Sequence, residues 1–277
     1  MSARSLAALA TLAAVAALAG PAQADPCEDP IDEPIAVAWR DAAFDAGRGA
    51  CLHTDVAFTA RGRALIDTEG FYGTLGGDAA IAARFVEGTR WEWGLAARAV
   101  DVAFIQNAVW TLVEPSYGPL TLHGAHGRGL TLAGRPARWA AVATVELPYT
   151  RSAVTGSAGA IQLAGVATWA VRPRLRLHGR VAALGWYARA ETGTTGRAAA
   201  ALAVDASWRG VAWMTFHLGF DLQAGWYRDG LDHLAVRGGA HWRVRGPWRA
   251  GLAAGTPLVG AERQDLAVTL GVRRDLD

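Results

Sequence analysis

The chain has 277 residues, 52% of them hydrophobic, and its 27 basic residues, all of them arginine, nearly balance 25 acidic residues to give a net charge of +2. A nucleic-acid-binding protein is expected to carry a strong basic excess, so the charge balance argues against that class. No stretch rich in proline, serine or charge divides the sequence into separate domains.

The N-terminus has the three parts of a secretory signal peptide. Arg4 precedes a short apolar run rich in alanine and leucine, which ends in Ala22-Gln23-Ala24. A positive charge, an apolar core and an Ala-x-Ala ending predict cleavage after Ala24, so that residues 1–24 are removed. An uncleaved membrane anchor is the alternative, but the apolar run is short for a span that needs about 20 residues.

Residues 25–51 form a separate N-terminal segment in the periplasm. Its cysteines, Cys27 and Cys51, are the only two in the chain, and an oxidising compartment favours a disulfide that closes the segment on itself. Residues 34–47 have the pattern of a short amphipathic helix. The segment could cap one end of the folded domain that follows, enter it as a plug, or remain a tail without a fixed place. Two thiols and His53 are too few ligands for a metal site, and the sequence predicts neither metal nor cofactor.

From residue 52 onward, apolar and polar residues alternate as in β-strands that have one apolar face. The clearest case is 213–227, where Phe216, Leu218 and Phe220 alternate with His217 and Asp221. The twelve predicted strands are 52–66, 73–86, 90–103, 119–131, 138–147, 159–172, 174–187, 198–209, 213–227, 232–245, 247–256 and 264–273. A loss of phase near residues 100–101 predicts a β-bulge.

The predicted connections alternate between short and longer ones. The short connections are 87–89, 132–137, 173, 210 and 246, and the longer ones are 67–72, 104–118, 148–158, 190–197, 228–231 and 257–263. No apolar run after the signal peptide is long and uncharged enough for a transmembrane helix.

In this combination the mature chain resembles the bacterial outer-membrane β-barrels as a class. The resemblance implies an all-β fold, a single antiparallel transmembrane barrel of about twelve strands over 52–277, with short periplasmic turns and both ends in the periplasm. It also implies outer-membrane lipid around the barrel and the barrel-assembly machinery as a partner during biogenesis. The chain departs from the class at its end, where Leu276-Asp277 replaces the usual terminal aromatic residue.

Two orientations of the strand faces are possible, since a soluble barrel would place its apolar face inward. Long strands, closely spaced arginines on the polar face and aromatic residues near strand ends favour lipid outside. The predicted aromatic girdle consists of Trp91, Trp93, Trp139, Trp169, Tyr187, Trp208, Trp226, Trp242 and Trp248.

With lipid outside, the polar face lines a lumen in which arginine outnumbers acid. The candidate selectivity residues are Arg61, Arg63, Arg84, Arg98, Arg174, Arg176, Arg180, Asp205, His217, Asp221, Arg237, His241 and Arg243. Such a wall indicates a channel for passive passage of small solutes with a mild anion preference. The alternative is that these arginines pair with acidic residues and fill the interior.

Two other functions are weighed against the channel. A non-conducting structural or adhesive barrel would bind a partner through the loops 104–118 and 148–158. An integral outer-membrane hydrolase would need a histidine followed two residues later by serine. Here Gly219 follows His217, Arg243 follows His241 and Arg180 follows His178, so we predict no enzyme. His233, beside Asp229 and Asp232, is the remaining acid-base candidate, although such a cluster is usually a solvated turn.

Overall fold

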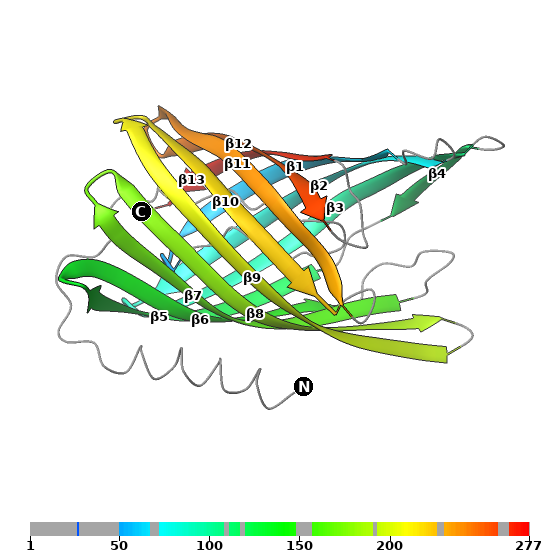
Figure 1. Cartoon of the computed structure of the whole chain (residues 1–277), viewed down its shortest axis with the longest axis horizontal. Coiled ribbons are helices and arrows are strands. Elements are labelled where there is room, and N and C mark those ends of the chain that lie inside the picture. The colour runs from blue at the N-terminus through cyan, green and yellow to red at the C-terminus, as the bar shows by residue number, and fades with distance from the viewer. Residues whose placement is uncertain are drawn as a thin grey trace.

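The strands wind into a barrel, seen from the side in Figure 1. The structure, a computed structural model, describes residues 27, 50–66, 72–107, 111–116, 120–147, 157–190, 193–225, 230–259 and 266–276. Its strands are β1 Asp55–Ile66, β2 Tyr72–Glu87, β3 Trp91–Asn107, β4 Thr111–Ser116, β5 Leu120–Leu132, β6 Arg135–Leu147, β7 Ser157–Arg172, β8 Leu175–Ala190, β9 Gly193–Val211, β10 Met214–Ala224, β11 Leu231–Arg245, β12 Trp248–Val259 and β13 Leu266–Asp275. Within these residues there is no helix long and apolar enough to cross a membrane.

The sheet closes on itself, because β1 pairs with both β2 and β13 and β2 also pairs with β3. All of these pairings are antiparallel. The short β4 pairs with the second half of β3, from Asp101 to Gln106, and β5 pairs with the first half, from Trp91 to Ala97. Since β4 and β5 occupy one place beside β3, the 13 strand segments make a closed barrel of 12 strands.

The predicted strands and the bulge are confirmed, with shifts of a few residues at the ends. The register of β2 with β3 skips Ala99, next to the predicted irregularity. Two connections were predicted wrongly. Much of 104–118 is strand, since β3 runs to Asn107 and β4 covers Thr111–Ser116, and the 190–197 connection shrinks to residues 191–192 between β8 and β9. In both places the backbone pairs beyond the point where the side-chain alternation weakens.

The five connections that were predicted to be short all lie at one end of the barrel, which we call the short-turn end. They are residues 88–90, 133–134, 173–174, 212–213 and 246–247. Ala133 and Gly134 both have positive φ, at 49° and 71°, as tight hairpins with a right-handed strand twist require. The start of β1 and the end of β13 lie at the same end, since Asp55 pairs with Asp275.

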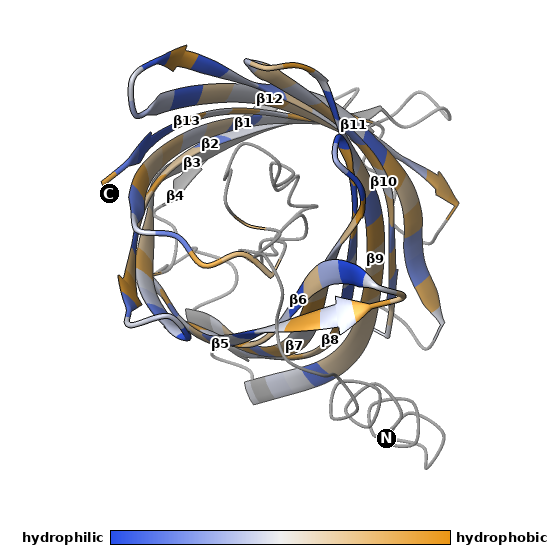
Figure 2. Ribbon diagram, turned by 90° about the vertical axis from the view of Figure 1, so that its left-hand side faces the viewer, coloured by the Kyte–Doolittle hydropathy of each residue, from blue (hydrophilic) through white to orange (hydrophobic). Residues whose placement is uncertain are grey.

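The structure orients the two faces of the sheet. Large apolar side chains point outward and are exposed, including Leu163 and Leu218 at 58% each and Ile81 at 53%. Polar side chains such as Arg61, Asp205 and His217 point inward and are buried. Figure 2 shows the alternation of hydrophobic and hydrophilic residues along the strands. The soluble-barrel alternative, with an apolar interior, is therefore wrong for most of the wall.

One part of the inner wall is nevertheless apolar. Small side chains on β5 to β9, among them Ala140, Ala164 and Ala182, are buried together with Ala50 in one cluster. The inner wall of β5 to β9 thus carries an alanine-rich patch among polar residues such as Arg138, Gln162 and Arg180.

The candidate functional site in the lumen

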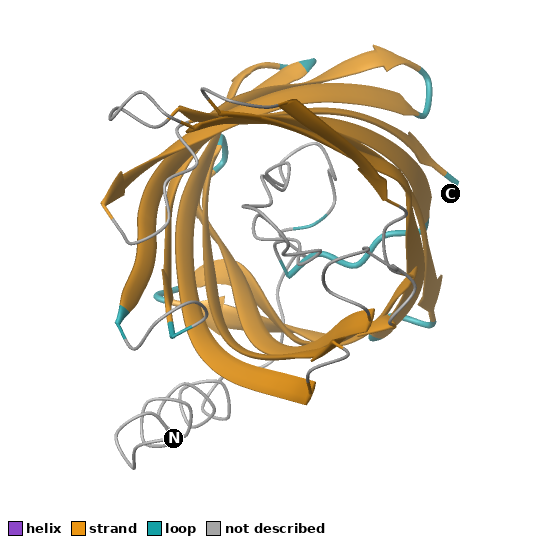
Figure 3. Ribbon diagram, turned by 90° about the vertical axis from the view of Figure 1, so that its right-hand side faces the viewer, coloured by secondary structure: helices purple, strands orange, loops and turns teal. Residues whose placement is uncertain are grey.

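Residues 50–54, which we call the strap, cross the interior of the barrel before β1 begins. The Ala50 N–H donates a hydrogen bond to Thr168 Oγ1 on β7 (3.0 Å), and the His53 N–H donates to Glu92 Oε2 on β3 (2.7 Å). β3 is three places from β7 in the 12-strand ring, and β1, which follows the strap, is five places from β7. The strap is the teal loop that runs through the interior in Figure 3.

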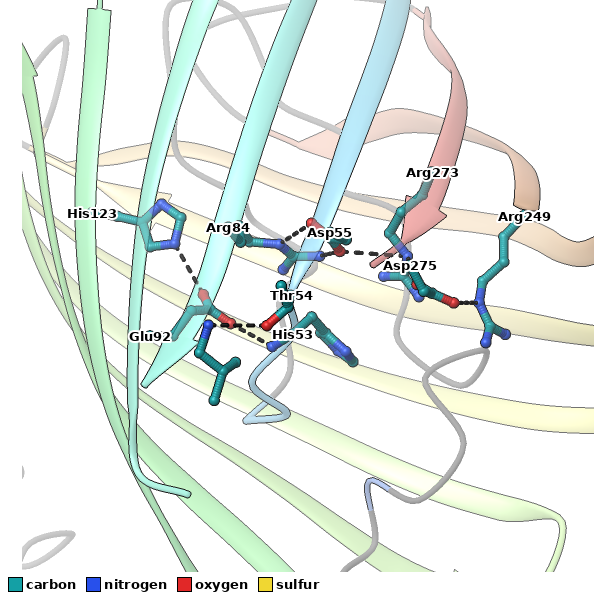
Figure 4. Close-up of polar contacts among 10 residues, drawn as sticks. His53, Thr54, Asp55, Arg84, Glu92, His123, Arg249, Arg273 and Asp275 are labelled. Carbon is teal, nitrogen blue, oxygen red and sulfur yellow. Dashed lines mark hydrogen bonds and ion pairs between the residues drawn. The ribbon is translucent and has the colours of Figure 1, made fainter. Parts of the chain in front are cut away.

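Glu92 is the anchor of the strap on the β3 side. Its side chain is fully buried, and its two carboxylate oxygens contact the His53 N–H and His123 Nε2, the latter at 2.9 Å (Figure 4). Gly94 makes room for this arrangement, because a Cβ there would lie 1.9 Å from the ring of His123. A buried carboxylate is stable only when its oxygens are hydrogen-bonded, and Glu92 meets this condition.

The end of the strap is hydrogen-bonded near the place where β1 and β13 close the barrel. Thr54 Oγ1 accepts a hydrogen bond from the Val86 N–H (3.1 Å), and the Thr54 carbonyl accepts one from the Leu276 N–H (3.0 Å). The strap is therefore held at both of its ends, by β7 on one side and by β2, β3 and the C-terminal end on the other.

The Cys27–Cys51 disulfide is confirmed, with 5.4 Å between the two Cα atoms. Cys51 is buried within the strap. The predicted helix at 34–47 and the signal peptide at 1–24 lie outside the described residues.

Ion pairs line the inner wall on β1 and β2. Arg61 binds Asp78 through Nε at 2.7 Å, and Arg84 binds Asp55 through Nε at 2.8 Å. Asp55 also lies 3.5 Å from Arg273, which is 3.2 Å from Asp275. The direct cross-strand positions of Arg61 with Asp78 and of Asp55 with Arg84 account for these bonds.

A third ion pair reaches across an intervening strand. Arg237 on β11 donates from Nε to Asp205 Oδ1 on β9 at 2.9 Å, although β10 separates the two strands. The residue between them on β10 is Gly219, where a Cβ would lie 1.9 Å from Asp205 Oδ1. The missing side chain is what lets the pair form.

Histidines form a polar group on the inner wall of β8 to β11. His178 is hydrogen-bonded through Nδ1 to Thr168 Oγ1 and through Nε2 to Ser207 Oγ, both at 3.0 Å. The His217 and His241 rings lie edge to face, 5.1 Å apart. The His217 nitrogens are buried and have no hydrogen-bond partner. The serine and histidine that contact each other come from different strands, so no local His-x-Ser pattern marks them in the sequence.

The other predicted lumen residues are divided between two places. Arg176 and Arg180 project inward from β8, and Arg180 is buried, as is Asp221, which contacts His233 at 3.1 Å. Arg174 and Arg243 are exposed near turns of the short-turn end. The side chains of Arg63 and Arg98 lie outside what the structure describes.

The residues of the predicted aromatic girdle lie mainly at the short-turn end. Trp91, Trp93, Trp208 and Trp248 are exposed there, and Trp139, Trp169 and Trp242 are half-buried on the outward face. Trp213, exposed in a turn, belongs with them but was missed. Tyr187 lies toward the opposite end of β8, and Trp226 is outside the described residues.

Solved structures with the same closed architecture include an outer membrane channel. The COG4313 outer membrane channel from Pseudomonas putida F1 covers 91% of this chain and 99% of its own, with a TM-score of 0.62 and 9% identity. The fold is that of an outer-membrane β-barrel. Such barrels include the translocator domain of autotransporter NalP from Neisseria meningitidis, which covers 82% of this chain and 89% of its own, with a TM-score of 0.51 and 9% identity. They also include the beta domain of the Bordetella autotransporter Brka, which covers 80% of this chain and 99% of its own, with a TM-score of 0.51 and 13% identity. No family model and no curated protein matches the sequence.

Proposed function

We propose that the protein is a channel of the bacterial outer membrane through which small solutes pass passively. The observation that carries the proposal is the closed barrel with an apolar exterior and a polar, charged inner wall. In this proposal residues 1–24 direct export as a signal peptide, and the short-turn end faces the periplasm.

The strap and the arginines of β8 are the parts of the lumen that would set what passes. Residues 50–54 cross the interior, so solute would have to pass beside them. Arg61, Arg84 and Arg237 bind carboxylates, which cancels most of their charge toward a solute. Arg176 and Arg180 also project inward from β8, and we infer that they contribute to any anion preference.

Conductance of the folded, full-length mature chain in planar lipid bilayers tests this function. A steady ohmic current is expected, and its reversal potential under a KCl gradient should indicate a mild preference for chloride. The variant Arg176→Gln with Arg180→Gln should weaken that preference, whereas the exposed control Arg174→Gln should keep it. Absence of current from correctly folded protein would reject the channel.

A non-conducting barrel is the second candidate, because the strap and the buried ion pairs occupy the interior. It predicts no current from the wild type and a loop-bound partner instead. The same bilayer measurement separates the two candidates.

A further inference from the structure

Exposed arginines gather at the short-turn end of the barrel. They include Arg90, Arg128, Arg135, Arg172, Arg174 and Arg245. Among the described residues of this end, Glu87 is the only exposed acidic side chain. The rim therefore carries a strong positive charge, although the chain as a whole is nearly neutral.

Aromatic rings lie directly beside part of this rim, on the outward face. The Trp91 and His126 ring centroids are 4.4 Å apart, and His126 lies 6.5 Å from Trp139. We call Trp91, His126 and Trp139, together with Arg90 and Arg128, the Trp91 cluster. Arg128 and Trp139 lie directly opposite each other on the neighbouring strands β5 and β6. The Gly127 N–H donates to the Arg90 carbonyl at 2.8 Å, which brings the turn carrying Arg90 against β5.

The cluster has the chemistry of a headgroup site. Tryptophan rings sit at the level where acyl chains meet headgroups, and arginine forms bidentate hydrogen bonds with phosphate. The His126 side chain belongs to the outward face, since Ala125 and Gly127 on either side of it are buried on the inner face, and its Nδ1 is buried without a hydrogen-bond partner in the protein. A site with aromatic rings toward the acyl chains and two guanidinium groups toward the aqueous side matches a phospholipid whose headgroup carries a net negative charge.

We propose that the Trp91 cluster binds the headgroup of an anionic phospholipid in the leaflet at the short-turn end. Arg90 and Arg128 hold the phosphate, Trp91 and Trp139 lie along the glycerol region, and His126 packs between the two tryptophan rings. The site requires a barrel in a membrane but not a conducting one, so it stands or falls apart from the channel function.

Quenching of tryptophan fluorescence by brominated lipids tests the site on the full mature chain in phosphatidylcholine vesicles. Brominated phosphatidylglycerol is titrated against brominated phosphatidylcholine, and Trp91→Phe defines the share of quenching that comes from the cluster. We expect that share to show preferential binding of phosphatidylglycerol. Each arginine near a membrane surface contributes about 1 kcal/mol, or about fivefold in binding. Arg90→Gln with Arg128→Gln should thus lower the preference at least fivefold.

A matched control removes the same charge from the same rim. Arg172→Gln with Arg174→Gln changes the turn between β7 and β8, and it should leave the cluster's preference within twofold of the wild type. Heat-modifiable migration on gels confirms that each variant folds. The proposal is overturned if both double variants lose the preference equally, if the wild type shows none, or if millimolar inorganic phosphate abolishes it.

Discussion

Gly219 occupies a position where any side chain would meet the buried ion pair between Arg237 and Asp205. A Cβ there would be 1.9 Å from Asp205 Oδ1 and 2.7 Å from the Val204 carbonyl. The second contact is with backbone, so rotation of the aspartate alone does not relieve the clash. The absence of a side chain at Gly219 therefore allows the ion pair to form, although Gly219 makes no hydrogen bond to it.

We predict that Gly219→Ala lowers the free energy of unfolding by about 1–3 kcal/mol, the range typical of overpacking. Urea titration in detergent micelles measures the change. Gly179→Ala on β8 is the control, since no atom lies within 4 Å of the added Cβ. It should be neutral or stabilise by up to about 1 kcal/mol. Equal effects of the two substitutions would mean that the cross-strand pair does not depend on Gly219.

At the level of single residues, the sequence predicted which side chains face inward but not which of them meet. Alternation alone placed Asp205, His217 and Arg237 on one face. Their contacts depend on register, and a glycine between two strands, as at Gly219, leaves no sign in the periodicity. The contact of Ser207 with His178, which joins β9 to β8, likewise depends on register.

The strap is an element without regular secondary structure that depends on two side chains from the wall. Thr168 accepts the hydrogen bond of the Ala50 N–H, and valine at this position would leave that buried donor without its acceptor. A net hydrogen bond contributes about 1 kcal/mol, which corresponds to about fivefold in an opening equilibrium.

We therefore predict that Thr168→Val raises the labelling rate of Cys51 about fivefold, after mild reduction, with a membrane-impermeant maleimide. Thr144→Val is the control, because Thr144 is also buried on the inner wall but makes no hydrogen bond to the strap. Labelling at the wild-type rate in Thr168→Val would show that this anchor does not hold the strap. If the protein conducts, the freed strap should also raise the current.

Element boundaries were predicted best where side chains alternate strongly. The 232–245 prediction and the observed β11, Leu231–Arg245, differ by one residue at one end. The strand β4 and the last residues of β3 were missed because their pairing continues through residues whose polarity no longer alternates. The strap could not be predicted at all, since its place depends on Glu92 and Thr168, which are far from it in the sequence.

In the whole molecule, apolar side chains mostly point outward and charged side chains mostly point inward, the reverse of a soluble protein. Lipid-exposed arginine costs about 2–4 kcal/mol near the middle of a membrane but only about 0–1 kcal/mol near its edges. Leu218, on the outward face of β10, and Val244, near the β11–β12 turn, are both strongly exposed, at 58% and 60%. They therefore compare two depths on the same face.

We predict that Leu218→Arg lowers the unfolding free energy in phosphatidylcholine vesicles by about 2–4 kcal/mol, while Val244→Arg lowers it by no more than about 1 kcal/mol. Guanidinium titration followed by tryptophan emission measures both. Two small and equal changes would place the outward face of β10 in water, contrary to a membrane-spanning barrel.

The meeting of β1 with β13 has a consequence for timing. Asp55 is paired with Asp275, so the strand that leaves the ribosome first must wait for the one that leaves last. Contacts between such distant segments form slowly. During that delay the edges of β1 and β13 are open to pairing with other chains, so a factor that shields them between synthesis and closure would prevent such pairing.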